Sequence, residues 1–411
     1  MKLQKPRGTR DFLPEEMRKR RFVEGIMGNI AERWGYEEIK TPTFESTELF
    51  TIKSGEGIIE EIYAFKDKGG RDISLRPELT APVMRMYVNE MQMTSKPLKL
   101  YYFDNCFRYE RPQKGRFREF WQFGVEIIGG KFPDADCEVI ALASSILDEL
   151  NIKARLHIGH LGLIRSILKD FDSSVQNDIL RLLDKKDEEG IKKTLDGFKD
   201  TKKSDTLIEI INLSGKSSIK AARDLIGDDV SLHELDRVVE MLNLYCVEPK
   251  IDFGIARGLD YYNGVVFEIY SDELGAQNQI CGGGSYRLAG LFGGTDVVST
   301  GFAFGFDRTL EVCNVDLPQK NKVVVAATDD TRGEAIKIAL KLREYVPTYF
   351  DIMQKGLKSQ LSFANTIGAS YAVIIGKKEL LEHKVTLKDM KTQKQELVDL
   401  DECVCRVTFI S

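Results

Sequence analysis

The sequence is poor in the residues that build disulfide frameworks and metal sites. Its seven cysteines are scattered and form no Cys-x-x-Cys pair, which argues against both a disulfide framework and a zinc knuckle. Only four histidines are present. His157 and His160 stand close together, but no other ligand type lies near them in the sequence, so we expect no metal site there.

Long hydrophobic runs are also missing. No run approaches the roughly 20 apolar residues of a membrane-spanning helix, and residues 1–16 lack an apolar signal core, so we expect a cytoplasmic protein without membrane contact. The net charge of −5 argues against a general nucleic-acid coat, which leaves local basic patches for any RNA contact. The absence of a GxGxxG or Walker loop disfavours a dinucleotide or P-loop site.

What is present predicts a globular protein with more than one domain. The 411 residues exceed one ordinary core, and 42% of them are hydrophobic and 30% charged. Residues 1–158 and 247–316 mix helices and strands and are expected to form one core in two parts. Residues 159–246, rich in Lys, Asp, Leu and Ile, predict an all-helical insertion. In residues 322–411 strands alternate with helices, which predicts a small α/β layer with a largely parallel sheet.

Chemistry is expected first in residues 104–129, which predict two strands joined by a loop. On the second strand Gln122, Gly124 and Glu126 share one face, because side chains alternate in direction along a strand. With Arg108 on the partner strand, this face suits an amine and a polar ring beside cations that grip phosphate. An exposed hairpin with a solvated basic tip is the alternative interpretation. The loop carries four basic residues: Arg111, Lys114, Arg116 and Arg118.

The segment Ile73–Pro82 predicts a strand that ends at Arg76, followed by the first turn of a helix. Glu78 and Thr80 would then stand at the mouth of that helix. A carboxylate in this position either caps backbone amides or receives the ammonium group of a ligand, and the residues alone leave both roles open.

Three segments in the second half of the core carry further polar residues. The turn ARGLDYYNG (256–264) precedes a strand, and its tyrosine hydroxyls can bond a ring nitrogen while Arg257 neutralises a developing anion; an aromatic turn packed in a core is the alternative. Glycines 282–284, followed by Tyr286, either let the backbone approach a ligand or form a flexible turn. In GFAFGFDR (301–308) a strand enters a helix, with Arg308 near its start.

These segments resemble the motifs of the class II aminoacyl-tRNA synthetases. ERPQKGRFREFWQFGVE (110–126) is similar to motif 2 of the histidyl-tRNA synthetases, closest to the archaeal branch, and GFAFGFDR resembles motif 3. LRPE-x-T (75–80) resembles the amino-acid pocket of that family, and RGLDYY-x-G-x-VFE (257–268) resembles its histidine-specific motif. A predicted helix and strand before Thr41-Pro42 resemble motif 1, which builds the dimer interface in that family. The chain departs from the commoner family form next to Tyr286, where Ser285 and Arg287 replace arginine and aspartate.

The resemblance implies an α+β class II synthetase catalytic core, with an antiparallel sheet flanked by helices, an all-helical insertion and a C-terminal α/β anticodon-binding domain. It implies histidine–tRNA ligation, in which L-histidine and ATP form histidyl-adenylate and pyrophosphate, and histidine then passes to the 3′ end of tRNA(His) with release of AMP. Mg²⁺ with ATP and a homodimer are also implied. The sequence does not identify the Mg²⁺ ligands.

The resemblance also assigns roles to residues. Arg108 and Arg257 would be catalytic, acting on the α-phosphate and the substrate carboxylate. Arg116 and Arg308 would hold the β- and γ-phosphates, Phe120 would stack on adenine, and Glu110 would lie near its amino group. The histidine pocket would comprise Glu78, Thr80, Arg108, Gln122, Glu126, Arg257, Tyr261, Tyr262 and Tyr286.

Two other functions are compatible with parts of this pattern. One is a non-catalytic relative that regulates histidine biosynthesis, although such relatives lack the histidine-specific motif and the anticodon domain. The other is a class II synthetase for a different amino acid. Lysines of the insertion, such as Lys185 and Lys186, either contact the acceptor arm of an RNA or form solvated helix faces.

Overall fold

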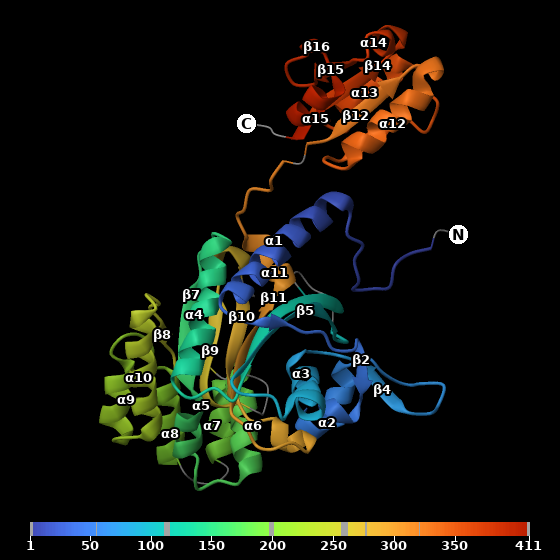
Figure 1. Cartoon of the computed structure of the whole chain (residues 1–411). Coiled ribbons are helices and arrows are strands. Elements are labelled where there is room, and N and C mark those ends of the chain that lie inside the picture. Colours follow the sequence, from blue (N-terminus) through green and yellow to red (C-terminus); the bar gives the residue numbers. More distant parts are fainter. Residues whose placement is uncertain are drawn as a thin grey trace. The chain divides into compact units, whose positions relative to one another are not determined.

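The computed structural model describes residues 3–54, 56–110, 116–196, 201–255, 262–275, 278–319 and 321–408. The chain forms two compact units, residues 1–315 and 316–411 (Figure 1). Among the described residues, every helix is too short or too polar to cross a bilayer.

One large sheet organises the first unit. Its strand order is β1-β5-β6-β11-β10-β9-β7-β8. From β5 to β7 neighbouring strands run antiparallel, and the edge strands β1 and β8 pair in parallel with β5 and β7. The predicted antiparallel core is confirmed. The strands are β1 (Glu37–Glu38), β5 (Leu98–Phe107), β6 (Glu119–Ile128), β7 (Arg155–His160), β8 (Lys250–Ile251), β9 (Tyr262–Tyr270), β10 (Gln279–Tyr286) and β11 (Ser299–Gly305).

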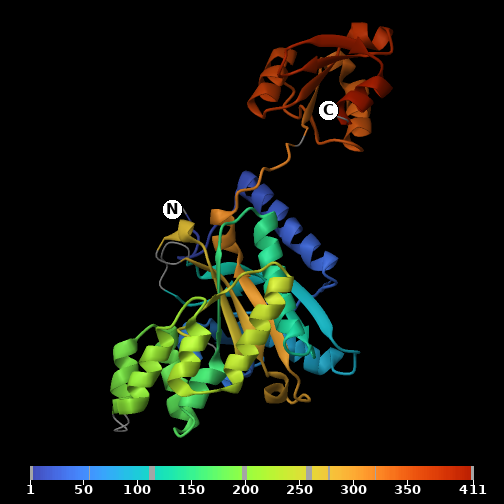
Figure 2. The same cartoon turned by 90° about the vertical axis from the view of Figure 1, so that its left-hand side faces the viewer.

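Helices α1 (Pro14–Arg33) and α4 (Asp134–Glu149) pack against each other and against one face of this sheet (Figure 2). Pro14 suits the first turn of α1, where its missing N–H costs nothing, and Gly35 follows the helix with a φ of +81°. Apolar side chains of both helices are buried in one continuous core with those of the strands. The candidate site described below lies on the opposite face of the sheet.

A smaller sheet and short helices lie beside β5. The order of this sheet is β2-β4-β3. After β4 the chain enters α3 and continues into a turn of π-helix, so the helix predicted after Arg76 begins at Thr80. The elements are β2 (Phe44–Ser46), α2 (Glu48–Ser54), η1 (Glu56–Glu61), β3 (Ala64–Lys66), β4 (Asp72–Leu75), α3 (Thr80–Met86) and η2 (Tyr87–Met91).

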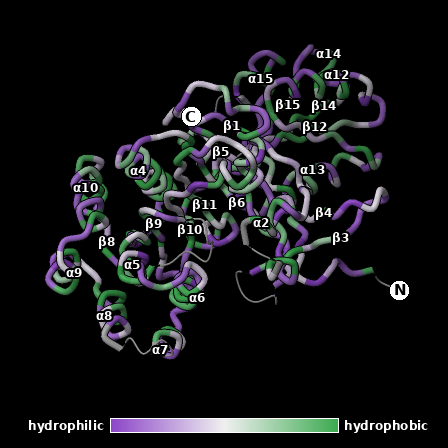
Figure 3. Tube along the Cα trace, turned by 90° about the horizontal axis from the view of Figure 1, so that it is seen from below, coloured by the Kyte–Doolittle hydropathy of each residue, from purple (hydrophilic) through white to green (hydrophobic). Residues whose placement is uncertain are grey.

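The segment between β7 and β8 is helical, as its composition predicts. Hydrophobic and hydrophilic residues alternate along these helices (Figure 3), and the apolar side pairs the helices with one another. Helix α10 also packs on α4, which joins the insertion to the core. The helices are α5 (Leu161–Ile167), α6 (Ser173–Asp184), α7 (Glu188–Asp196), α8 (Thr201–Ile211), α9 (Ser218–Ile226) and α10 (Val230–Leu244). Three short elements complete the first unit: η3 (Asp272–Leu274), η4 (Ala289–Phe292) and α11 (Phe306–Val312).

The second unit has a mixed sheet of order β13-β12-β14-β15-β16. The predicted parallel arrangement holds for β13, β12 and β14, whereas β15 and β16 add an antiparallel hairpin. This hairpin was not predicted; in it Lys388, Gln395 and Glu396 lie among the buried Val385, Leu387 and Val398. The elements are β12 (Val323–Ala327), η5 (Asp329–Thr331), α12 (Arg332–Arg343), β13 (Thr348–Phe350), α13 (Leu357–Thr366), β14 (Tyr371–Ile375), α14 (Lys377–Leu381), β15 (Val385–Asp389), β16 (Gln395–Val398) and α15 (Leu400–Thr408).

Candidate active site

Small residues from neighbouring strands form the floor of the site. The register pairs Gly124 of β6 with Ala303 of β11, and Ala303 with Gly282 of β10. Gln122, Gly124 and Glu126 lie on the same face, as predicted, because they occupy alternate positions along β6. The Tyr102 hydroxyl fills the space above Gly124, where an added Cβ would lie 2.4 Å from it, whereas Gly282 and Ala303 line a cavity.

A cavity of about 230 Å³ opens at one end of this floor. It is bounded by the ends of β5 and β6, by β10 and by the start of α11. All five side chains predicted to bind ATP line it, together with Gln122 and Asp307. The five are Arg108, Glu110, Arg116, Phe120 and Arg308.

The cavity wall carries more positive than negative charge. Arg108 lies against Phe120, with its Cζ atom 5.2 Å from the ring centroid, and its Nε donates to the carbonyl of Pro77. Arg308 Nη1 donates to the carbonyl of Gln279 at 2.9 Å. Burial and the neighbouring Arg116 lower the pKa of Arg308. An anion bound among these guanidinium groups would relieve their repulsion.

A buried carboxyl group lies farther along the floor. Glu126 is 1% exposed and accepts a hydrogen bond from the Tyr286 hydroxyl at 2.6 Å. Burial raises the pKa of Glu126 to about 8. Gly301, opposite Glu126 in β11, is required here, because an added Cβ would lie 2.0 Å from Glu126 Oε2. Tyr262, also buried, meets the Tyr286 ring edge to face at 6.2 Å.

Glu78 stands beside this carboxyl group at the start of α3. Its carboxylate accepts hydrogen bonds from the backbone N–H groups of Thr80 at 2.7 Å and Ala81 at 3.2 Å, so it caps the helix. Burial raises the pKa of the Tyr102 hydroxyl well above its usual value, and the charges of Glu126 and Glu78 raise it further. Glu78 therefore has a structural role as a helix cap, and its binding of a ligand remains a prediction.

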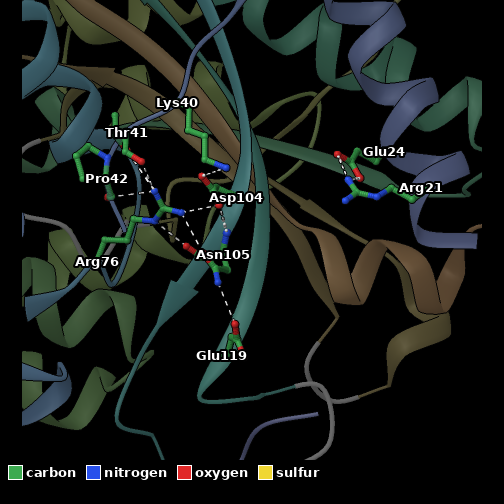
Figure 4. Close-up of polar contacts among 9 residues, drawn as sticks. All are labelled: Arg21, Glu24, Lys40, Thr41, Pro42, Arg76, Asp104, Asn105 and Glu119. Carbon is green, nitrogen blue, oxygen red and sulfur yellow. Dashed lines mark hydrogen bonds and ion pairs between the residues drawn. The ribbon is translucent and has the colours of Figure 1, made fainter. Parts of the chain in front are cut away.

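Arg76 was not predicted to have a role, yet its contacts connect the segment at Thr41 with strand β5 (Figure 4). Its side chain is fully buried and lies 2.6 Å from Asp104 of β5. It also donates to the carbonyls of Thr41 at 2.8 Å and Asn105 at 2.8 Å. These contacts fix the position of the backbone around Arg76, two residues before Glu78. Tyr102 was missed as well, although its position opposite Gly124 follows from the strand register.

Tyr286 contacts Glu126 although its neighbours Ser285 and Arg287 depart from the commoner family form. Ser285 points to the other face of the sheet and donates a hydrogen bond to the buried carboxylate of Asp136 in α4. Arg287 pairs with Asp296 at 2.5 Å on the surface. Tyr286 therefore reaches Glu126 with different neighbours.

Several predicted residues remain outside the description of the structure. Arg257 and Tyr261, together with Arg111 and Lys114 of the basic loop, lie outside the described residues. His157 and His160 lie within them, and each has a ring nitrogen 2.8 Å from a carboxylate, of Asp252 and Glu234 respectively. In the described ranges no three His, Cys, Asp or Glu side chains gather as a metal site would require.

An antiparallel sheet flanked by helices, with arginines from several segments around a cavity over its strands, defines a class II aminoacyl-tRNA synthetase. A family model described as histidyl-tRNA synthetase matches residues 8–309, and one described as an anticodon binding domain matches residues 319–408. The chain belongs to the histidyl-tRNA synthetase family. The predicted family and its archaeal branch are confirmed.

Relatives and solved structures agree with this assignment. The chain is 52% identical to a histidine–tRNA ligase of Methanosarcina acetivorans, over 99% of both chains. It is 50% identical to one of Archaeoglobus fulgidus, over 98% of both. The apo histidyl-tRNA synthetase of S. aureus has a TM-score of 0.72 at 29% identity and covers 98% of this chain and 99% of its own. A Bacillus halodurans structure titled ATP phosphoribosyltransferase regulatory subunit/histidyl-tRNA synthetase has a TM-score of 0.79 at 27% identity, covering 92% of this chain and 99% of its own.

Proposed function

We propose that the chain catalyses histidine–tRNA ligation at the cavity over β6 and β11. L-histidine and ATP give histidyl-adenylate and pyrophosphate, and histidine is then transferred to the 3′ end of tRNA(His). The observation that carries this proposal is the juxtaposition of an arginine-lined cavity with a buried Glu126–Tyr286 pair on one small-residue floor. The first suits a triphosphate, and the second suits an amine or an imidazole.

In the activation step the protein positions the two substrates and neutralises their charge. The histidine carboxylate attacks the α-phosphorus, and the bond to the pyrophosphate oxygen breaks. Arg108 and Arg257 are proposed to neutralise the α-phosphate and the attacking carboxylate. Arg116 and Arg308 are proposed to hold the β- and γ-phosphates, which leave as pyrophosphate.

The adenine is proposed to stack on Phe120, with Glu110 near its amino group. Both residues line the cavity beside the arginines. Mg²⁺ would enter with ATP and neutralise phosphate charge. Of the cavity-lining carboxylates, Glu110 lies 3.2 Å from Arg116 and Asp307 pairs with two other arginines, so neither is arranged as a Mg²⁺ ligand.

The histidine pocket is proposed to select its substrate through buried polar groups. Glu126 and Tyr286 would bind the imidazole or amine, together with seven further residues. A substrate without ring nitrogens would leave these buried groups unpaired, which costs more than a lost apolar contact. The further pocket residues are Glu78, Thr80, Arg108, Gln122, Arg257, Tyr261 and Tyr262.

The remaining partners follow from the family. Residues 319–408 match the anticodon-binding model, which supports tRNA(His) as the RNA substrate. A homodimer is proposed through α1 and the strand that follows it, the segment that resembles motif 1. The cytoplasm is the proposed location of the enzyme.

Exchange of labelled pyrophosphate into ATP tests this function. Purified protein should support exchange with histidine and with no other amino acid, and Arg257→Ala should lower the exchange rate more than it weakens ATP binding. Arg181→Ala, at a 51% exposed side chain of α6, is the control. No exchange would favour a regulatory relative, whereas exchange with proline or threonine alone would refute the assigned specificity.

A further inference from the structure

Two arginines near the start of the described chain converge on the carboxylate next to Arg308. Arg10 Nη2 lies 2.6 Å and Arg20 Nη1 lies 2.7 Å from Oδ1 of Asp307. The other oxygen, Oδ2, accepts a hydrogen bond from the backbone N–H of Trp121 at 3.1 Å. Asp307 is 7% and Arg20 is 4% exposed, so water screens this cluster little. One carboxylate thus joins the N-terminal segment, α1, β6 and α11.

Aromatic rings hold the two guanidinium groups in place. Arg10 Cζ lies 3.5 Å from the ring centroid of Phe117. Arg20 Cζ lies 4.1 Å from the centroid of Phe12 and 4.7 Å from that of Trp121. Arginine stacks well on aromatic faces when both are withdrawn from water. The rings at positions 117 and 121 belong to the segment that also carries the proposed adenine-stacking residue.

Two contacts to backbone carbonyls strengthen the same connection. Lys19 Nζ of α1 donates to the carbonyl of Leu310 at 3.0 Å, near the end of α11, where a cation is favourable. The N–H of Arg118 donates to the carbonyl of Gly8 at 2.9 Å. Gly8 has a φ of +84°, and an added Cβ would lie 2.7 Å from Arg118 Cγ, so only glycine permits this approach. The N-terminal segment therefore contacts Arg118, the residue before β6, and Asp307 of α11.

We propose that Arg10, Arg20 and Asp307 are positioning residues for the ATP site. The inference rests on the proposed function, because these residues act through the side chains that would bind ATP. The Asp307 carboxylate lies in the cavity wall, but it accepts hydrogen bonds from Arg20 and the Trp121 N–H and forms an ion pair with Arg10. It therefore sets the start of α11, and with it Arg308, relative to the segment that carries Phe120. A small displacement of Arg308 or Phe120 would weaken the binding of a nucleotide that contacts both side chains.

The charge balance of the cluster decides which variant is informative. Removing Arg10 leaves Arg20 and Asp307 as a balanced buried pair, so Arg10→Met is expected to fold. Removing the carboxylate would instead leave two neighbouring guanidinium groups uncompensated, which is strongly destabilising. Arg181→Met is the matched control, because Arg181 also lies in a helix, α6, but has a 51% exposed side chain that pairs with Asp178.

The experiment measures histidine-dependent pyrophosphate exchange at varied ATP and, separately, at varied histidine. For Arg10→Met we expect the KM for ATP to rise about tenfold, the size of effect transmitted through one network contact. The KM for histidine should change by less than about twofold, because the contacts of Arg10 do not include the Glu126 side of the floor. Arg181→Met should match the wild type in both KM values, and Arg10→Lys should recover part of the ATP affinity by restoring the charge.

Other outcomes would overturn the inference. A variant with an unchanged KM for ATP, or with equal rises for ATP and histidine, would show that the cluster only stabilises the fold. If Arg10→Met does not fold, Arg10→Lys provides the same comparison. Absence of exchange in the wild type would instead refute the proposed function, and calorimetric titration of ATP into wild type and Arg10→Met would then still test the cluster.

Discussion

The buried carboxyl group of Glu126 should make the stability of the first unit depend on pH. Its pKa is about 8 in the fold, against an ordinary value of 4.5, because burial disfavours the charged form. Below pH 4.5 the group is protonated in both folded and unfolded chains and carries no penalty. As the pH rises, the unfolded chain ionises first, so stability falls until the folded group ionises as well.

The size of this effect follows from the two pKa values. Each pH unit between them corresponds to about 1.4 kcal/mol, so the full penalty above pH 8 is about 5 kcal/mol. Glu126→Gln keeps the shape and a hydrogen-bond acceptor for Tyr286 but cannot ionise. Between pH 5 and pH 8.5 the wild type should therefore lose about 4 kcal/mol more unfolding free energy than the variant.

Urea unfolding followed by tryptophan fluorescence measures this difference. The chain has two tryptophans, Trp34 and Trp121, and both lie in the first unit, so the signal reports that unit alone. Groups distant from Glu126 titrate equally in both proteins and cancel in the comparison. Glu149→Gln, an exposed change on α4, should follow the wild type. Parallel pH curves for wild type and Glu126→Gln would refute the argument that burial keeps this group protonated.

Two further changes test the floor of the site and the strands beside it. Gly301→Ala should destabilise the first unit by about 1–3 kcal/mol and abolish histidine-dependent exchange, because the added Cβ would lie 2.0 Å from Glu126 Oε2. Gly305→Ala should keep its unfolding midpoint, because its added Cβ would lie 3.8 Å from the carbonyl oxygen of Ile280, an ordinary contact distance. A normal midpoint for Gly301→Ala in urea would contradict the packing described above. Arg76→Met should cost about 3–5 kcal/mol, because Asp104 would lose the guanidinium 2.6 Å away, and a loss below about 1 kcal/mol in the same assay would show that the pair contributes little.

The sequence by itself determined the local elements with strong patterns. In the second unit β12 and β14 are continuous apolar runs, Val323–Ala327 and Tyr371–Ile375, and polar or glycine residues bound each of them. The face shared by Gln122, Gly124 and Glu126 also follows from the two-residue repeat of a strand. The family resemblance rests on such short segments, and the family match confirms it.

The tertiary structure decided which of these segments meet. Tyr286 reaches Glu126 across 160 positions of sequence, and Arg20 reaches Asp307 across 287. Such contacts depend on strand order and register, which no local pattern contains. A buried arginine is also indistinguishable from an exposed one in the sequence, so the roles of Arg76 and Arg20 became visible only once the chain was folded around them.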